Sequence, residues 1–337
     1  MTIFLHIGTH KTGTTTLQRF ARKNEQVLAK SGCLYPDYNL IGKKGHYAHH
    51  HIAHALAEDE NNRLSEKAAK RFIQKVVELS SEYESVLISA EPLYRHYLGQ
   101  LPVSIDRMAY WDARKQYISK VRDCFGKAEV QIVMTIRQQA GFAMSLYQEN
   151  IKVRRYSKPF SVFLDEHWYY FEYLKQAEMW KEFFGSVRLL AFESLTKGGK
   201  LVENFFKSLD NINIENCIFP ERTNESLCPD FLEFKRMMNQ TSFSLNELRS
   251  LRYFLEENSA SWFSEQGKKK KIVVEAETLN KFQASFLEEN NKLARIYCGQ
   301  EESVLPVKRY SAGEEYGELK PEQAFEIFAR YAKSLSD

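Results

Sequence analysis

Residues 3–18 read IFLHIGTHKTGTTTLQ, and this stretch indicates a strand, a turn and the start of a helix. The apolar run Ile3–Ile7 predicts a buried strand that stops at Gly8. A tight segment with Lys11 and Gly13 follows, and three threonines then open an amphipathic helix. The first amides of a helix lack intrahelical acceptors and carry a partial positive charge, so an anion fits there. The stretch therefore predicts a loop that holds a phosphate-like group.

The lysine of this loop stands in a different place from the lysine of the nucleotide-triphosphate P-loop. That motif puts Lys directly after its second glycine and follows it with Ser or Thr. Here Gly8 and Gly13 have the P-loop separation. Thr14, however, occupies the lysine position, and Lys11 precedes the second glycine. An ordinary strand-to-helix turn is the other interpretation, but such a turn does not call for a lysine and three hydroxyl groups together.

The order Lys-Thr-Gly-Thr-Thr, which begins at Lys11, resembles the 5′-phosphosulfate-binding loop of sulfotransferases that use 3′-phosphoadenosine 5′-phosphosulfate (PAPS). The resemblance implies PAPS as co-substrate, adenosine 3′,5′-bisphosphate as product and no required metal. Lys11 would act catalytically by neutralising charge on the bridging and leaving oxygens. The residues expected to bind the co-substrate here are Lys11, Thr12, Gly13, Thr14, Thr15 and Thr16.

Composition and length limit the class of protein. The chain has 337 residues and a net charge of +3, which argues against a general nucleic-acid-binding protein. Its five cysteines are scattered without a CxxC pair, which suits a reducing cytoplasm rather than a disulfide framework or a zinc site. No apolar run approaches the roughly 20 residues of a membrane-spanning helix. We therefore expect a cytoplasmic protein without a transmembrane segment, and the resemblance then favours a bacterial-type enzyme.

Short apolar runs alternate with helical patterns in the first part of the chain. Buried strands are expected at 3–7, 85–89, 130–136 and 187–192. Helices are expected at 17–31, 65–84, 109–125 and 168–184. Because strands that alternate with helices imply right-handed crossovers, we predict an α/β fold with a P-loop-like doubly wound parallel sheet.

Beyond residue 195 the pattern becomes helical and polar. Amphipathic helices are expected at 200–209, 229–238, 245–257 and 277–297, with irregular segments at 210–228 and 258–275. The lysine run Lys268–Lys271 indicates a solvated loop rather than a binding patch. Since no Pro/Gly-rich linker separates the two parts, we predict a single domain, 1–337. Its nucleotide-binding core would be 1–195, and 196–337 a mainly helical extension.

An arginine, Arg137, ends the strand 130–136, and Ser145 follows on the next helix. Ligands of open parallel sheets bind beyond the carboxyl ends of the strands, and an arginine fork matches phosphate geometry. The pair resembles the 3′-phosphate-binding element of PAPS sulfotransferases, which implies that Arg137 and Ser145 bind that phosphate. A kinase would usually place an acidic residue at such a strand end to organise magnesium. More loosely, Thr223–Leu227 resembles a polar loop of bacterial members, and a helix cap is the alternative there.

A general base must take the proton of the acceptor hydroxyl, and two candidates stand out. Glu91 follows the strand 85–89 and would act as the base or orient Lys11 or a loop amide. The other candidate is a cluster on a helix expected from about Tyr47. It contains His46, His49, His50, His51 and His54. We expect His50 or His46 to face the acceptor. Histidine pairs at this spacing also bind zinc, but no acidic or cysteine ligand accompanies them.

The acceptor is the least specified part. Residues 152–173 mix Arg154, Arg155 and Lys158 with several aromatic residues, which suit an anionic glycan, although most of these aromatics would equally form core. We expect transfer to a hydroxyl of a carbohydrate, a polysaccharide or a glycolipid, with peripheral contact to a membrane-borne glycan and no nucleic-acid partner. The alternatives are a P-loop-type small-molecule kinase and a catalytically inactive nucleotide-binding scaffold.

Overall fold

The computed structural model describes residues 1–59, 62–99, 106–210, 212–219, 227–266, 274–312 and 316–335. Contacts divide the chain into two compact units. The first consists of Met1–Gln138, Trp168–Glu221 and Leu287–Pro306. The second consists of Gln139–His167, Arg222–Phe286 and Val307–Asp337. Both units thus draw on both sides of residue 195, and the single domain with a 1–195 core stays a prediction.

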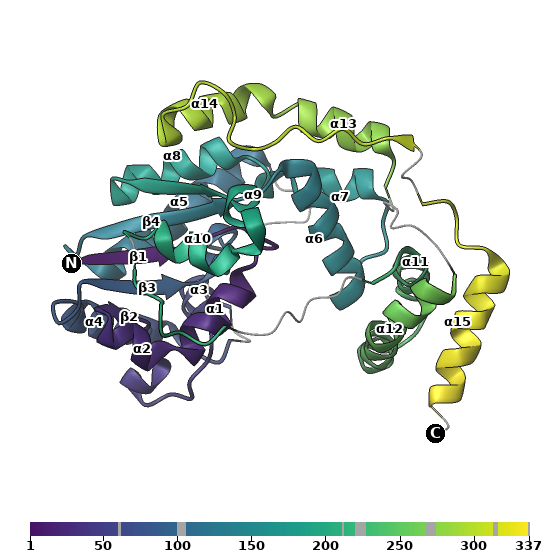
Figure 1. Cartoon of the computed structure of the whole chain (residues 1–337), viewed down its shortest axis with the longest axis horizontal. Helices are drawn as coiled ribbons and strands as arrows, with labels where there is room; N and C mark the ends of the chain where they lie inside the picture. The colour runs from purple at the N-terminus through teal and green to yellow at the C-terminus, as the bar shows by residue number, and fades with distance from the viewer. Residues whose placement is uncertain are drawn as a thin grey trace. The chain divides into compact units, whose positions relative to one another are not determined.

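A parallel sheet with strand order β2-β3-β1-β4-β5 forms the centre of the first unit (Figure 1). Its strands are β1 (Thr2–His6), β2 (Cys33–Leu34), β3 (Ser85–Ser89), β4 (Val130–Ile136) and β5 (Val187–Ala191). β1 lies between β3 and β4, with Leu5 opposite Ile88 on one side and Ile132 on the other. Four of these strands were predicted, and β2 was missed because two residues give no periodic pattern.

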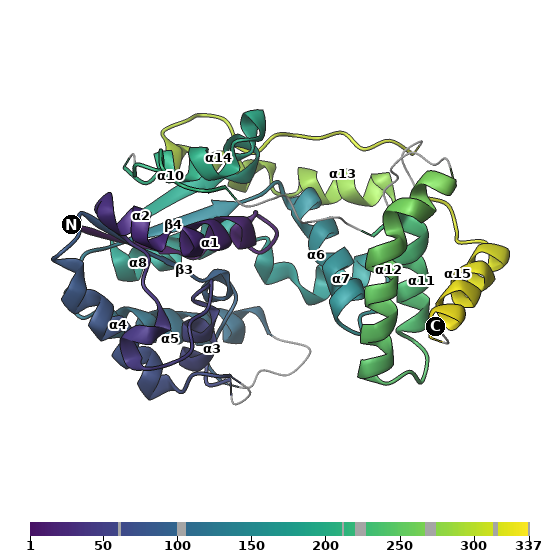
Figure 2. The ribbon, with the colours of Figure 1, turned by 60° about the horizontal axis from the view of Figure 1, so that its bottom comes forward.

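Helices cover both faces of this sheet, which confirms the predicted α/β doubly wound class. One face carries α1 (Thr14–Lys23), α2 (Glu25–Lys30) and α10 (Leu201–Lys207). The other carries α3 (His50–Leu56), α4 (Glu66–Ser80), α5 (Arg107–Phe125) and α8 (Tyr173–Phe184). Figure 2 shows α4 and α5 on one side of the strands and α10 on the other. The remaining helical elements described in this unit are η1 (Tyr38–Ile41), η2 (Glu91–Tyr94), η3 (Trp168–Tyr170), α9 (Phe192–Leu195), η4 (Lys197–Gly199) and α14 (Leu287–Cys298).

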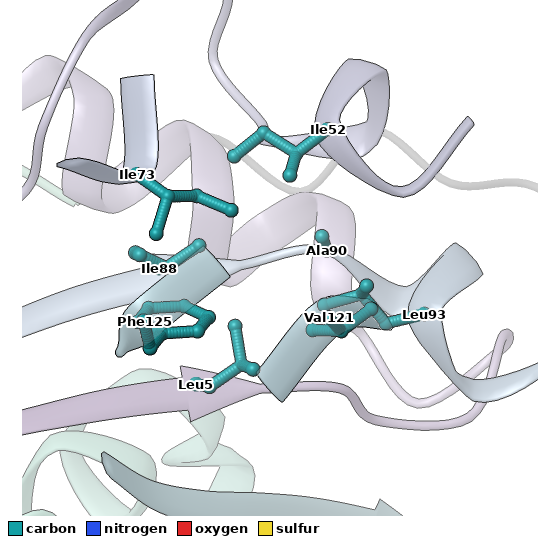
Figure 3. Close-up of a pocket in the computed structure, with 8 residues that line it drawn as sticks. All are labelled: Leu5, Ile52, Ile73, Ile88, Ala90, Leu93, Val121 and Phe125. Atoms are coloured by element: carbon teal, nitrogen blue, oxygen red, sulfur yellow. The ribbon is translucent and has the colours of Figure 1, made fainter. Parts of the chain in front are cut away.

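The strands are nearly continuous apolar runs. Because successive side chains point to opposite sides of the sheet, such runs make both faces of the sheet apolar. Phe4, Leu87 and Val133 pack against α1, α2 and α10. Leu5 and Ile88 point the other way, toward apolar side chains of α3, α4 and α5 (Figure 3). The void that they enclose measures about 10 Å³, so it is a packing gap rather than a ligand site. Ligands of open parallel sheets bind instead beyond the carboxyl ends of the strands.

The described part of the second unit is helical. It contains α6 (Gln139–Val153), α7 (Phe160–Glu166), α11 (Pro229–Met238), α12 (Leu245–Glu265), α13 (Ala276–Ala284) and α15 (Pro321–Ser334). Asp230 of α11 is buried, and its carboxylate accepts hydrogen bonds from Trp262 Nε1 (2.8 Å) and from the Tyr316 hydroxyl. Asn239 Nδ2 donates to Ile151 O at 2.9 Å and so links the end of α11 to α6.

Several helix predictions need correction. The predicted helix 17–31 is divided at Asn24, whose Nδ2 turns back to Phe20 O (2.9 Å), and the predicted helix 277–297 is divided into α13 and α14. The segment 258–275 was expected to be irregular, but α12 continues to Glu265. The helix expected from Tyr47 begins at His50. Thr223–Ser226 and Lys268–Lys271 lie outside the described residues.

None of the helices within the described ranges is both long enough and apolar enough to cross a membrane.

Candidate active site

The loop between β1 and α1 has the strand-turn-helix form that the sequence predicts. Lys11 and Gly13 both have left-handed backbones, with φ of 64° and 75°. Gly13 caps α1, and its positive φ favours glycine; a Cβ here would also displace the Leu201 Cδ2 methyl group of α10. Thr12 Oγ1 donates to Thr9 O at 2.6 Å. The hydroxyl hydrogen of Thr12 is thus used inside the loop, and Thr12 would offer a ligand only its backbone amide.

The N-terminus of α1 presents hydrogen-bond donors at this loop. The first helical hydrogen bonds run from Thr16 N (3.0 Å) and Leu17 N (3.2 Å) to Gly13 O, so the amides of Thr14 and Thr15 precede the helical ladder. Thr9 Oγ1 is buried and has no hydrogen-bond partner among the described residues. Together with the positive end of the helix dipole, these donors fit a tetrahedral anion such as a phosphate or sulfate group.

Arg137 lies beside this loop, directly after β4. Its Nη1 donates to Lys11 O at 3.0 Å, and its guanidinium carbon lies 5.2 Å from the centre of the Phe192 ring. The Tyr173 hydroxyl donates to Arg137 O at 2.6 Å. The guanidinium is therefore held at the anion-binding loop from two sides. Ser145 lies on α6 in the second unit, and its part in a phosphate site stays a prediction.

Glu91, directly beyond Ala90 at the end of β3, is only 6% exposed. Its Oε2 accepts hydrogen bonds from His50 Nε2 (2.6 Å) and Gln18 Nε2 (2.8 Å), and its Oε1 lies 3.8 Å from His10 Nδ1. Burial acts to raise the pKa of Glu91, but the hydrogen bonds from His50 and Gln18, and the positive charge that His50 and His10 carry when protonated, hold that pKa well below its usual range. The carboxylate is therefore ionised at neutral pH.

Glu91 and His50, two candidates for one role in the sequence, form a hydrogen-bonded pair. An ionised carboxylate only accepts hydrogen bonds, so His50 carries its proton on Nε2. Its Nδ1 is then the ring nitrogen that can accept a proton, and no described residue donates a hydrogen bond to it. The side chain of His50 is 21% exposed. The arrangement suits a histidine base that a carboxylate orients.

The other histidines of the predicted cluster have different contacts. His49 is fully buried: its Nε2 donates to Pro36 O (2.8 Å), its Nδ1 accepts from Ser89 N (3.0 Å), and burial lowers its pKa to about 4. His46 Nδ1 accepts from Ala48 N (3.1 Å), and the ring stacks on Tyr47. His51 pairs with Asn62 and His54 with His96. Across the described ranges, no three His, Cys, Asp or Glu side chains are placed to hold a metal ion.

Three residues of the site were not found from the sequence: Gln18, His10 and His6. Gln18 is fully buried on α1, one turn after Thr14, and this position on the loop helix was the available signal. His6 is also fully buried, with Nδ1 2.9 Å from Ser89 Oγ and Nε2 3.1 Å from Thr135 Oγ1. It thereby links the carboxyl ends of the three central strands. A polar residue among apolar strand neighbours was the signal for His6.

The mixed basic and aromatic stretch at 152–173 is largely used in packing and pairing. Lys158 Nζ and the Tyr156 hydroxyl both bond to the Glu166 carboxylate, and Arg155 Nε donates to Asn239 O at 3.0 Å. Phe160, Tyr170 and Tyr173 are buried. For these residues, the interpretation as core and ion pairs is therefore the better one.

No protein-family model and no curated protein sequence matches the chain. Among solved structures, a sulfotransferase from Alicyclobacillus acidocaldarius is similar, with a TM-score of 0.37 and 17% identity over 79% of this chain and 96% of that one. A similarity of this size does not establish a shared fold. The assignment of a function therefore rests on the β1–α1 loop, Arg137 and the Glu91–His50 pair.

Proposed function

We propose that this protein is a sulfotransferase that moves the sulfuryl group of PAPS to a hydroxyl of a carbohydrate acceptor. One observation carries the proposal. The β1–α1 loop, with Lys11 and the free amides of α1, and the ionised Glu91 paired with His50 both lie beyond the carboxyl ends of the central strands. Gln18 of α1 connects the loop helix to the pair. An anion cradle and a base are the two parts that sulfuryl transfer to a hydroxyl requires.

The residues at the strand end favour sulfuryl over phosphoryl transfer. Kinases of the P-loop class place a lysine after the second glycine and hold magnesium through an acidic residue. Here Thr14 stands in the lysine position, and β4 is followed by Arg137 and Gln138. An arginine at that point suits a ligand that carries a second phosphate, as PAPS does.

The reaction assigns a role to each group. The acceptor oxygen forms a bond to sulfur while the bond from sulfur to the bridging phosphate oxygen breaks, and the hydroxyl proton passes to His50 Nδ1. Lys11 and the amides of Thr14 and Thr15 stabilise the charge that collects on the leaving phosphate. Glu91 holds His50 in the tautomer with a bare Nδ1. A carboxylate with a lowered pKa is itself a weak base at neutral pH, which favours His50 as the proton acceptor.

The second phosphate and the acceptor complete the proposal. Arg137 and Ser145 would bind the 3′-phosphate, as the sequence resemblance implies. A carbohydrate hydroxyl is the acceptor class that the same resemblance favours. Because the leaving group departs with both phosphates, the product is adenosine 3′,5′-bisphosphate.

Calorimetry with adenosine 3′,5′-bisphosphate, with and without magnesium, tests the nucleotide site. We expect binding that does not depend on the metal, and transfer of labelled sulfate from PAPS to at least one extract in a panel of polysaccharides and glycolipids. Magnesium-dependent binding of ATP without binding of the bisphosphate would instead identify a kinase. Nucleotide binding without transfer to any glycan would identify a scaffold.

A further inference from the structure

Glu91 has two histidines within reach, one on each carboxylate oxygen. His50 Nε2 lies 2.6 Å from Oε2, and His10 Nδ1 lies 3.8 Å from Oε1. Only His50 is at hydrogen-bond distance, and a shift of the carboxylate that brought Oε1 close enough to bond His10 would lengthen the bond from His50 to Oε2. His10 belongs to the anion-binding loop, whereas His50 begins α3. The orientation of the Glu91 side chain therefore decides which ring it holds.

Gln18 makes the contact that fixes this orientation. Its Nε2 donates to Glu91 Oε2 (2.8 Å), the same oxygen that accepts from His50, and also to Ser89 Oγ (3.1 Å). Ser89 Oγ is in turn 2.9 Å from His6 Nδ1, so the amide is anchored to the ends of the central strands. The assignment of the amide nitrogen follows from the ionised carboxylate, because the amide oxygen in its place would face Glu91 with like charge.

The amide oxygen of Gln18, Oε1, indicates that a glutamine stands at this position for function rather than for packing. Gln18 is fully buried, and its Oε1 has no hydrogen-bond partner among the described residues. A buried acceptor without a donor loses its hydrogen bond to water on folding, and an apolar side chain of the same size would avoid this cost. The contacts of Nε2 are thus the reason for an amide at this position.

We infer that Gln18 is a positioning residue that keeps Glu91 on His50 rather than on His10, and so fixes the proton of His50 on Nε2. The inference rests on the proposed function only in naming His50 as the base. It also connects the two halves of the site, because α1 carries the anion-binding amides at Thr14 and Thr15 and the amide of Gln18 one turn later. Movement of α1 would therefore reach the base through Gln18.

The test uses Gln18→Leu, and Gln18→Met as a second variant of similar length without a donor. Long-range ¹H–¹⁵N spectra of histidine-labelled protein report the tautomer of each ring at neutral pH. We expect His50 to change from the single Nε2–H tautomer to a mixture, with a matching change at His10. The control is Gln176→Leu, which removes another fully buried glutamine, bonded to Arg114 Nε at 3.1 Å. It should leave the signals of His50 and His10 unchanged.

Kinetics supply the second readout. Because Gln18 acts through the pair and not on the nucleotide, Gln18→Leu should lower kcat about 10-fold while the Kd for adenosine 3′,5′-bisphosphate stays within about 2-fold. In a His50→Asn background the same substitution should cost almost nothing in kcat, since coupled residues are not additive.

An unchanged His50 tautomer in both Gln18 variants would overturn the inference. So would a loss of nucleotide affinity as large as the loss of kcat, which would show that Gln18 acts on the loop. A changed tautomer in a protein that transfers no sulfate would have a different meaning: the proposed function would fail, and the role of Gln18 in orienting Glu91 would stand.

Discussion

The β1–α1 loop and the Glu91–His50 pair lie at the same edge of one sheet but are built in different ways. The loop is a run of consecutive residues whose donors are mainly backbone amides, set by the left-handed conformations of Lys11 and Gly13. The pair joins side chains that are 41 residues apart, from η2 and α3. Replacing a side chain in the loop leaves most of its donors in place, whereas replacing one in the pair removes the group itself. Binding and chemistry should therefore separate under mutation.

Lys11→Ala is expected to have the largest effect. The side chain supplies charge at the leaving oxygens, so sulfuryl transfer should fall about 10³-fold, the upper range for loss of one electrostatic contact in an active site. The backbone amides remain, so nucleotide affinity should change much less than kcat, and the melting temperature little. Steady-state kinetics, calorimetry and thermal unfolding check the three parts.

Lys23→Ala, at the other end of α1, is the matched control and should leave transfer unchanged. A Lys11→Ala variant with an intact kcat would remove the lysine from the reaction and leave the loop as a plain anion cradle.

His50→Asn should lower kcat about 10²-fold, as expected for loss of a general base. Its neighbour in the sequence, His49, gives a matched comparison. His49 is buried and bonded to Pro36 O and Ser89 N, so His49→Asn should lower the melting temperature and leave kcat per folded molecule unchanged. If the two variants exchanged these effects, the base would be wrongly assigned.

This contrast also explains what the sequence could and could not predict. The loop and strands β1, β3, β4 and β5 were predictable because each depends on local pattern: consecutive apolar residues, then glycine, lysine and threonine. Lys11, Thr14 and Arg137 could be placed at one sheet edge because the carboxyl ends of parallel strands meet there.

Contacts between side chains from distant segments were not predictable. Glu91 and His50 were both candidates, but their hydrogen bond depends on how α3 packs beside η2, which no local pattern encodes. Gln18 was missed for the same reason, since its role depends on Ser89 and Glu91, more than 70 residues away in sequence. The chain passes from one contact unit to the other after Gln138, where α6 follows without a Pro/Gly-rich linker, so no local pattern marks this point in the sequence.

Arg137→Ala tests which ligand group the arginine serves. If it binds the 3′-phosphate, affinity for adenosine 3′,5′-bisphosphate should fall about 10-fold or more, within the 1.5–3 kcal/mol of a hydrogen bond to a charged group. Affinity for AMP, which lacks that phosphate, should change little. Because Arg137 Nη1 also holds Lys11 O, an equal loss for both nucleotides would show that the arginine only supports the loop. Arg188→Ala, on β5, is the control.

The smallest expected effect is a change of stability with pH, caused by two buried histidines, His6 and His49. Burial lowers the pKa of His6 and His49 to about 4 from an ordinary value of 6.5. Between these values the unfolded chain binds a proton that the folded chain does not, so acid favours unfolding. Each histidine should therefore cost about 1.4 kcal/mol of unfolding free energy per pH unit below 6.5. Urea unfolding at pH 7.0 and 5.5 measures this loss. His49→Asn should unfold with a shallower pH dependence, and an unchanged slope would mean that His49 titrates alike in the folded and unfolded chain, so that the bond from Ser89 N to its Nδ1 does not hold the ring neutral.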